Sequence, residues 1–180
     1  MARIAVDKSF YDNSGGGVTF SGGEPLAQPA FLAELLQSCR QRGIHTAVET
    51  CGYAPAQEVA RLEPLIDLFL YDVKIVDPER HWAWTGRGNE PILENLRLLA
   101  HRGKDKIAVR VPLVPEATDD EKNLAGISAL CDALGLRRPE LLPYHALGAG
   151  KYAELGREYR LAAAVQPRFN RGQGELHDLS

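Results

Sequence analysis

The sequence predicts an α/β fold built on an open, partial barrel of parallel strands. Short apolar stretches alternate along the chain with segments of helical periodicity, which is typical of right-handed βαβ units. The stretch from Leu65 to Val73 is almost continuously apolar, as expected for a strand buried on both faces of a parallel sheet. Five strands are too few to close an eight-stranded barrel, which takes about 250 residues. The sheet is therefore expected to stay open.

Length and composition indicate one ordinary globular domain. The chain has 180 residues, of which 44% are hydrophobic and 25% are charged. The formal net charge of -3 gives no overall attraction to nucleic acid or to an anionic membrane. No apolar run of about 18 residues predicts a transmembrane helix, and the first residues do not resemble a secretory signal. We therefore expect a cytoplasmic protein that binds neither nucleic acid nor membrane.

Local patterns predict a strand and a long helix in the first quarter of the chain. Residues 3–13 could form either the tail of a helix or a loose lead-in. Residues 18–21 are β-branched and aromatic, which predicts the first strand. A helix opens at Pro29 and ends at Gly43. Its expected inward face consists of Phe31, Leu32, Leu35, Leu36 and Cys39.

The pattern of strand and helix then repeats. A strand over residues 44–49 stops at Gly52, and a short helix over 55–62 begins at a proline. The apolar run over 65–73 is the third strand, and a loop is expected over 77–88. Each helix connects two strands that we expect to be parallel.

The last part of the chain contains two more helices and two more strands. A helix over 91–103 begins at a proline and ends at a glycine, and a strand over 107–111 follows. Residues 118–121 read as a capping box, in which the threonine side chain accepts one backbone N–H and the glutamate reaches back to another. The helix behind this box stops at Gly135, and a short strand covers 141–142. Its expected buried residues are Leu124, Ile127, Leu130, Cys131 and Leu134.

Polar residues or glycines lie at the end of every predicted strand. Ligands of open parallel sheets bind at this edge. Five such sets on one rim predict a ligand that carries both charges, held in part by bare backbone at the glycine-rich stretch 15–26. The sets are Ser21-Gly22-Gly23-Glu24, Glu49-Thr50-Cys51-Gly52, Asp72-Val73-Lys74, Arg110 and Pro143-Tyr144-His145.

Each of these residues also has a structural explanation, and the residues alone leave both readings open. A buried guanidinium needs a partner whatever its function, and a surface ion pair is worth little. The structural alternatives are an ion pair of Lys74 with Asp72, a salt bridge of Arg110, a hydrogen-bonded loop position for His145, capping or solvation for His81 and Asn89, and packing for Trp82 and Trp84.

Six separated motifs favour the functional reading. They are GGGVTFSGGEPL at 15–26, ETCGY at 49–53, YDVK at 71–74, TGRGN at 85–89, RVPLVP at 110–115 and LLPYH at 141–145. In this order they resemble the glycyl-radical-enzyme activating enzymes of the radical S-adenosylmethionine (radical SAM) superfamily, such as pyruvate formate-lyase activating enzyme. The resemblance runs from about Val6 to Leu161. It implies a TIM-barrel-like radical SAM barrel that lacks its first strand–helix unit here, and the glycine-rich lead-in resembles the branch with a ferredoxin-like insert.

The resemblance also implies roles for individual residues. Gly22, Gly23 and Glu24 match a motif whose backbone meets the amino group of SAM, and Lys74 would face the SAM carboxylate. Glu49, Thr50 and Asp72 match a site that holds a monovalent cation beside that carboxylate. Arg110 and His145 match further positions of the SAM pocket. A zwitterionic sulfonium ligand suits this mixture of backbone donors, a cation and carboxylates.

The implied reaction is reductive cleavage of SAM at a [4Fe-4S] cluster. The resulting 5′-deoxyadenosyl radical takes a hydrogen atom from a glycine of a partner glycyl radical enzyme, such as pyruvate formate-lyase. A flavodoxin or a ferredoxin-type protein is the implied reductant. The cofactors carry the difficult chemistry, and the protein positions them.

The cysteines depart from the family pattern. The family holds its cluster through Cys-x3-Cys-x2-Cys, which should lie upstream of residue 15, whereas Cys39, Cys51 and Cys131 are separated by 12 and 80 residues. We therefore expect this chain to supply no cluster ligand and no catalytic residue. It is expected to be a truncated barrel over 1–165 with a loosely ordered tail over 166–180. Two hypotheses follow, the inactive core of an activating enzyme or a cluster-less module that binds SAM or docks a partner.

Overall fold

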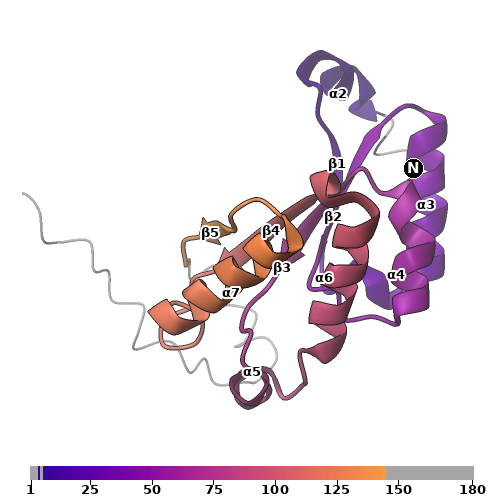
Figure 1. The fold of residues 1–180 in the computed structure, drawn as a ribbon. Coiled ribbons are helices and arrows are strands. Elements are labelled where there is room, and N and C mark those ends of the chain that lie inside the picture. Colours follow the sequence, from indigo (N-terminus) through magenta and orange to yellow (C-terminus); the bar gives the residue numbers. More distant parts are fainter. Residues whose placement is uncertain (1–3, 5, 145–180) are drawn as a thin grey trace, which may run out of the picture. The chain divides into compact units, whose positions relative to one another are not determined.

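One open, parallel sheet of five strands organises the protein. The computed structural model describes residue 4 and residues 6–144, and all the helices and strands of these residues lie in a compact unit that ends at Pro143. The strands pair in chain order and every pair is parallel, which confirms the predicted open α/β sheet (Figure 1). The strands are β1 (Gly17–Phe20), β2 (His45–Thr50), β3 (Leu68–Asp72), β4 (Ile107–Pro112) and β5 (Glu140–Leu142).

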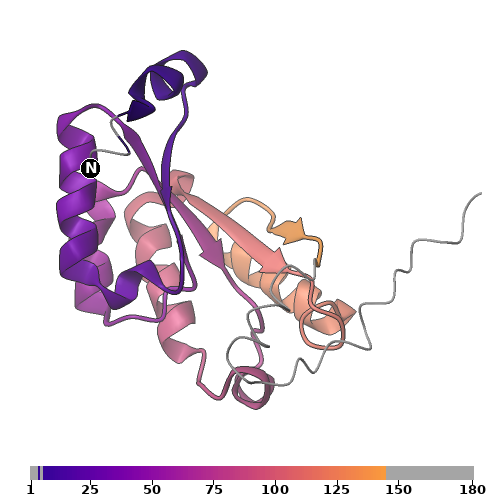
Figure 2. The same ribbon diagram turned by 180° about the vertical axis from the view of Figure 1, so that it is seen from behind.

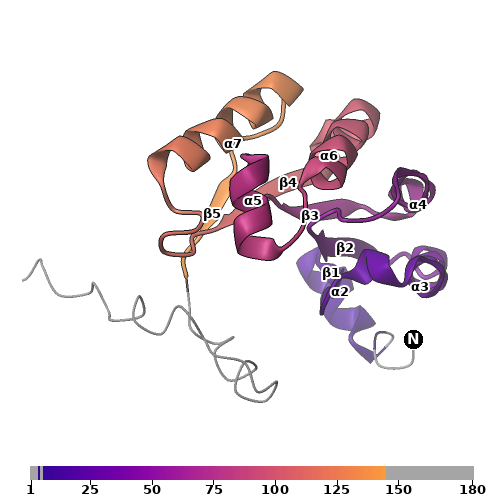
Figure 3. The same ribbon diagram turned by 90° about the horizontal axis from the view of Figure 1, so that it is seen from below.

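Helices connect the strands and cover one face of the sheet. Figures 2 and 3 show α3, α4, α6 and α7 along this face, whereas α5 lies beyond the end of β3. No helix among the described residues combines the length and the apolar character that a membrane crossing needs. The helices are α2 (Lys8–Ser14), α3 (Pro29–Gln41), α4 (Ala56–Leu62), α5 (Pro78–Thr85), α6 (Glu90–Gly103) and α7 (Glu121–Leu134), with 3-10 turns at η1 (Pro25–Ala27), η2 (Glu63–Leu65) and η3 (Lys104–Lys106).

The core lies between the sheet and these four helices. On β3, Phe69 and Tyr71 point into it and are 1% and 0% exposed, whereas Leu68, Leu70 and Asp72 on the other face are half-buried. The sequence led us to expect a strand over 65–73 that is buried on both faces. That prediction was wrong, because the turn η2 takes the first residue of the run and the second face of β3 is not fully covered.

The segment expected to be a loop over 77–88 contains helix α5. Asp77 caps it, because its carboxylate accepts a hydrogen bond from the Arg80 N–H at 2.9 Å, and Pro78 occupies its first position. Gly86 ends it with a left-handed φ of 70°. The cap signals were therefore present, but the helix has little apolar periodicity. Trp82 and Trp84 were expected to pack and instead are 62% and 45% exposed.

The predicted capping box of α7 is shifted by two residues. Asp120, not Thr118, is the cap, and its carboxylate accepts a hydrogen bond from the Asn123 N–H at 3.0 Å. The Thr118 hydroxyl instead closes the preceding loop, because it accepts from the Val114 N–H at 2.7 Å and donates to the Pro112 carbonyl. Thr118 and Asp120 could both accept a hydrogen bond at the start of α7, and their spacing in the sequence does not reveal which of them becomes the N-cap.

Two residues of the predicted inward face of α3 lie outside the core, and one of them, Leu35, is half-buried. Leu32, Leu36 and Cys39 are buried, but Phe31 is 57% exposed. Phe31 precedes Leu32 by one position, about 100° around the helix, and the core uses the narrower face that also includes Ala33.

Candidate functional site

The parallel register brings the carboxyl ends of β1, β2 and β3 to the same edge of the sheet, where a cavity of about 180 Å³ opens. A second cavity of about 430 Å³ adjoins it and shares Glu24, Cys51, Asp72 and Lys74. Its volume is in the range of small-molecule sites. The first cavity is lined by Ser21, Gly22, Gly23, Glu24, Glu49, Thr50, Cys51, Asp72 and Lys74.

Bare backbone forms one wall of the smaller cavity. Gly22 has a φ of 131°, a value that side chains disfavour, so glycine is required there. A Cβ atom added at Gly22 or at Gly23 would meet no atom within 4 Å. The space beside these two residues is therefore open, and their peptide groups are accessible to a ligand.

The Glu24 carboxylate fastens the end of β1 to the end of β2. Its Oε1 accepts hydrogen bonds from the Leu26 N–H at 3.1 Å and from the Thr50 hydroxyl at 2.5 Å. Its Oε2 accepts from the Cys51 N–H at 3.0 Å and from the Cys51 thiol at 3.1 Å. Burial, followed by this hydrogen bond, raises the pKa of the Cys51 thiol. The Glu24 side chain therefore fixes the wall of the cavity formed by Thr50 and Cys51, and the Glu24 backbone continues the wall formed by Gly22 and Gly23.

Arg110 joins two carboxylates from neighbouring strands. Its Nη2 lies 2.5 Å from Glu49 Oε1 and 2.8 Å from Asp72 Oδ1, and its Nε donates to the same Asp72 oxygen at 3.0 Å. The Arg110 side chain is 11% exposed. A guanidinium buried to this degree needs such partners, so the salt bridge that the sequence left open as the structural alternative for Arg110 is present.

The surroundings shift the pKa values of the two carboxylates in opposite directions. The Ser21 hydroxyl, which donates to Glu49 Oε2 at 2.7 Å, and then Arg110 lower the pKa of Glu49. Burial raises the pKa of Asp72 against the opposing effect of Arg110. Among the described residues none donates a hydrogen bond to Asp72 Oδ2, so the capacity of this oxygen to accept is not used within that part of the chain.

Lys74 lines both cavities. Among residues 6–144, no carboxylate lies within ion-pair distance of its amine, so the surface ion pair with Asp72 that the sequence left open does not form. The side chain is half-buried and is the cation of the smaller cavity.

The structure brings together seven of the nine residues predicted for the SAM pocket in one cavity: Gly22, Gly23, Glu24, Glu49, Thr50, Asp72 and Lys74. Arg110 contacts two of them, and His145 lies outside the described residues. The Thr50 hydroxyl donates to Glu24, and the cation that bridges Glu49 and Asp72 is the Arg110 guanidinium. Within the described part of the chain no group of three His, Cys, Asp or Glu side chains could hold a metal ion. The monovalent cation at Glu49, Thr50 and Asp72 stays a prediction.

Several residues in or near the cavities were missed or misjudged in the sequence, and one of them, His81, lines the larger cavity. His81 and Asn89 were expected to serve for capping or solvation, but they are 4% and 2% exposed, and Asn89 occupies the N-cap position of α6 without a side-chain capping hydrogen bond. Asn95 donates to the Gly52 and Ala54 carbonyls, both at 2.8 Å, and so holds the loop after β2. Asn123 is 2% exposed. A single asparagine within a helical pattern carries no sequence signal for such a role, since its partners lie far away in the chain.

Comparison with known proteins agrees with this geometry. A model of the radical SAM superfamily matches residues 5–126. The isethionate sulfite-lyase activating enzyme of Nitratidesulfovibrio vulgaris is 49% identical over 88% of the chain and 52% of its own length. The choline trimethylamine-lyase activating enzyme of Oleidesulfovibrio alaskensis is 46% identical over 87% of the chain and 51% of its own length. The chain thus spans about half the length of these curated relatives.

A solved structure matches over most of its length. The crystal structure of a domain of pyruvate-formate lyase-activating enzyme from Bacteroides vulgatus superposes with a TM-score of 0.64 and 40% sequence identity. The match covers 72% of this chain and 81% of that domain.

Proposed function

Because the chain belongs to the radical SAM superfamily, among the activating enzymes of glycyl radical enzymes, we propose that the cavity at the ends of β1, β2 and β3 binds S-adenosylmethionine. The observation that carries the proposal is the set of groups around this cavity. It combines the Lys74 amine, the open backbone at Gly22 and Gly23, and the Asp72 oxygen that no described residue uses. SAM has a carboxylate, an ammonium and a sulfonium group, so each of its charges finds a complement.

Each residue of the pocket has a distinct task in this proposal. Lys74 binds the carboxylate of SAM, and the peptide groups of Gly22, Gly23 and Glu24 meet its amino group. Glu49 and Asp72 supply negative potential near the sulfonium, and Arg110 holds these two carboxylates in place. The Thr50 hydroxyl orients Glu24. His145 stays a proposed pocket residue on the basis of the sequence.

Isothermal titration of the chain with SAM tests the site. Lys74→Ala removes the cation opposite the SAM carboxylate, so the affinity should fall about tenfold or more. Lys122→Ala serves as the matched control, because Lys122 is exposed on α7 and lines neither cavity. No binding by the unaltered chain, or equal effects of the two substitutions, would contradict the proposal.

The residues of this chain do not fit the cluster. Cys39 and Cys131 are buried, on α3 and α7, and the Cys51 thiol donates a hydrogen bond to the Glu24 carboxylate. These positions do not form the closely spaced thiolate set that a [4Fe-4S] cluster needs. SAM bound at a cluster supplies the radical chemistry of the family. Because the cysteines of this chain do not fit a cluster, we propose that it holds SAM without cleaving it.

The partner is part of the same proposal. The relatives carry the names of activating enzymes, so a glycyl radical enzyme is the proposed partner and a flavodoxin or ferredoxin-type protein the proposed reductant, in the cytoplasm. The second candidate is a cluster-less module that binds SAM or docks a partner, and the cysteine pattern favours it. Reconstitution with iron and sulfide tests both candidates, because cluster absorbance would show that the chain completes a cluster site and would contradict each of them.

A further inference from the structure

The segment that carries Lys74 leaves the sheet directly after β3. The hydrogen bonds to β4 reach as far as Val73, whose N–H donates to the Arg110 carbonyl at 3.0 Å. The following residues, Lys74, Ile75 and Val76, lie beyond the described strand pairing. Ile75 is 2% exposed, and both Lys74 and Val76 are half-buried. Their backbone groups therefore need partners within the protein.

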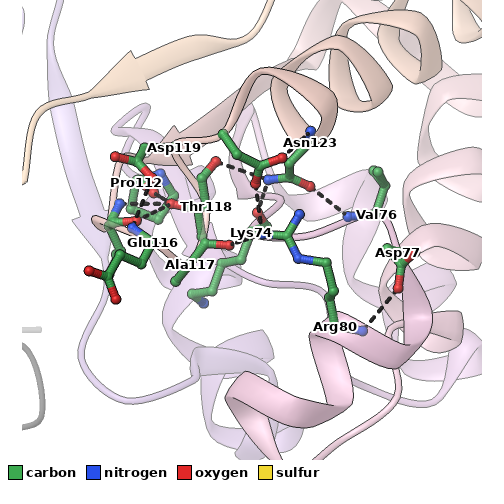
Figure 4. Close-up of polar contacts among 12 residues, drawn as sticks. Lys74, Val76, Asp77, Arg80, Pro112, Glu116, Ala117, Thr118, Asp119 and Asn123 are labelled. Carbon is green, nitrogen blue, oxygen red and sulfur yellow. Dashed lines mark hydrogen bonds and ion pairs between the residues drawn. The ribbon is translucent and has the colours of Figure 1, made fainter.

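Asn123, in the first turn of α7, supplies two of these partners (Figure 4). Its Oδ1 accepts from the Val76 N–H at 3.2 Å, and its Nδ2 donates to the Lys74 carbonyl at 2.8 Å. The side-chain amide therefore contacts the segment as a neighbouring strand would, with one donor and one acceptor. A second hydrogen bond from Nδ2, to the Thr118 carbonyl at 3.0 Å, fixes the orientation of the amide.

Asn89, the residue before α6, supplies two further hydrogen bonds to this segment. Its Nδ2 donates to the Ile75 carbonyl at 3.1 Å and to the Val76 carbonyl at 2.9 Å. The two asparagines, which we call the asparagine clamp, thus satisfy four backbone groups of residues 74–76. A carboxamide has two N–H donors and a separate oxygen acceptor, so Asn123 can bind a backbone N–H and a carbonyl of the segment at once and Asn89 can bind two carbonyls.

The clamp is itself held from outside the segment. The Asn123 N–H donates to Asp120 Oδ1 at 3.0 Å, and Arg80 Nη2 lies 2.7 Å from Asp120 Oδ2. The same Arg80 nitrogen donates to the Ala117 carbonyl at 3.1 Å. These contacts connect α5 to the start of α7, as Figure 4 shows. Asn123 is therefore positioned independently of the residues it holds.

We propose that Asn123 and Asn89 are positioning residues of the SAM site, which fix the backbone from which Lys74 reaches the cavity. The inference rests on the proposed function, because it takes Lys74 to be the group that binds the SAM carboxylate. The clamp acts at the point where the sheet no longer constrains the chain. Without it, residues 74–76 have unsatisfied buried groups and the Lys74 amine loses its fixed direction.

A double-mutant cycle on SAM affinity tests this role. Asn123→Ala should weaken SAM binding about tenfold, but should add nothing once Lys74 is already alanine. Leu99→Ala is the control for general destabilisation, because Leu99 is 1% exposed in the core and makes no polar contact with the segment. Its effect on affinity should be small in either background. Equal effects of Asn123→Ala with and without Lys74 would overturn the inference.

Asn123→Asp sharpens the test. The aspartate keeps the acceptor for the Val76 N–H but places a second oxygen against the Lys74 and Thr118 carbonyls. It should therefore fail to restore SAM affinity, although its volume is almost that of asparagine. Restored affinity would overturn the role of the Nδ2 donor.

A measurement without SAM separates failure of this inference from failure of the proposed function. The Lys74 Hε–Cε cross-peak, assigned by its loss in Lys74→Ala, should shift in Asn123→Ala and stay in place in Leu99→Ala. The Val76 N–H should exchange at least about tenfold faster in Asn123→Ala, while the Val109 N–H in β4 keeps its rate. If the unaltered chain does not bind SAM, the proposed function fails and these two signals still decide on the clamp. An unchanged cross-peak or an unchanged exchange rate overturns it.

Discussion

At the scale of single residues, the charged side chains at the edge of the sheet divide by what they already bind. Glu24 accepts four hydrogen bonds and Arg110 donates to two carboxylates, so both hold strand ends in place. Lys74 and one oxygen of Asp72 have no such partner among the described residues. The site is therefore built from a saturated frame with a small number of groups left for a ligand.

Gly52 shows how closely this frame is packed. A Cβ at this position would lie 1.7 Å from the Tyr71 hydroxyl, which donates to the Ile92 carbonyl at 2.6 Å. Gly52→Ala should lower the free energy of unfolding by about 2–4 kcal/mol, from the left-handed φ of 73° and the displaced hydroxyl. Gly86→Ala is the matched control. Its φ is 70° with nothing within 4 Å, so only the backbone cost of about 1 kcal/mol is expected. Equal losses in urea unfolding would contradict the packing explanation.

Glu49 predicts a dependence of stability on pH. Its pKa is lowered in the folded protein by Ser21 and then by Arg110, so its contribution is present above the pKa of the unfolded chain and is lost as the pH falls through the folded value. The stability difference between the unaltered chain and Glu49→Gln should therefore shrink in acid, below the ordinary glutamate range. Asp72 is present in both proteins, so its contribution to the pH dependence of the free energy of unfolding largely cancels in the difference. A difference that is constant from neutral to acid pH would count against the role of the charge.

At the scale of elements, the sequence predicted what periodicity and caps encode. The five parallel strands and the helices α3, α4, α6 and α7 follow from apolar spacing bounded by proline and glycine. Helix α5 could not be predicted from apolar spacing, because two tryptophans on it are exposed and only His81 is buried. The cap of α7 depends on the preceding loop, where the Thr118 hydroxyl is engaged with Pro112 and Val114. Local capping hydrogen bonds and loop geometry, not apolar periodicity, therefore define α5 and the start of α7.

Helix α5 should depend on its cap, because its buried apolar area is small. Asp77→Ala removes the acceptor for the Arg80 N–H and should cost about 1 kcal/mol in urea unfolding. Asp77→Asn keeps an acceptor of the same length and should cost less than half as much. The exchange rate of the Arg80 N–H measures the cap directly. If both variants lose the same stability, the charge of Asp77 matters rather than its capping geometry.

At the scale of the whole described unit, the site follows from topology. Parallel strands joined by helices must end at one edge of the sheet. The sequence order of strands and helices therefore suffices to predict that the residues after β1, β2 and β3 lie together, and no side-chain contact has to be known. The asparagine clamp could not be predicted in this way. Asn89 and Asn123 lie 13 or more residues from the backbone groups Val76 and Lys74 to which they bind, and neither belongs to a strand end.

Binding of SAM without cleavage is the prediction for the chain as a whole. A ligand that binds only the folded state stabilises it by mass action, and SAM at 100 times its dissociation constant should add about 2.7 kcal/mol. S-adenosylhomocysteine keeps the carboxylate and the amino group, so it should stabilise the chain too, and Lys74→Ala should weaken both effects. With iron, sulfide, dithionite and SAM, 5′-deoxyadenosine should stay at the level of a reaction without protein. Thermal unfolding and chromatography of the same samples give both readouts. Formation of 5′-deoxyadenosine would show that Cys39, Cys51 and Cys131 support a cluster after all, whereas a midpoint that SAM does not raise would reject the binding site itself.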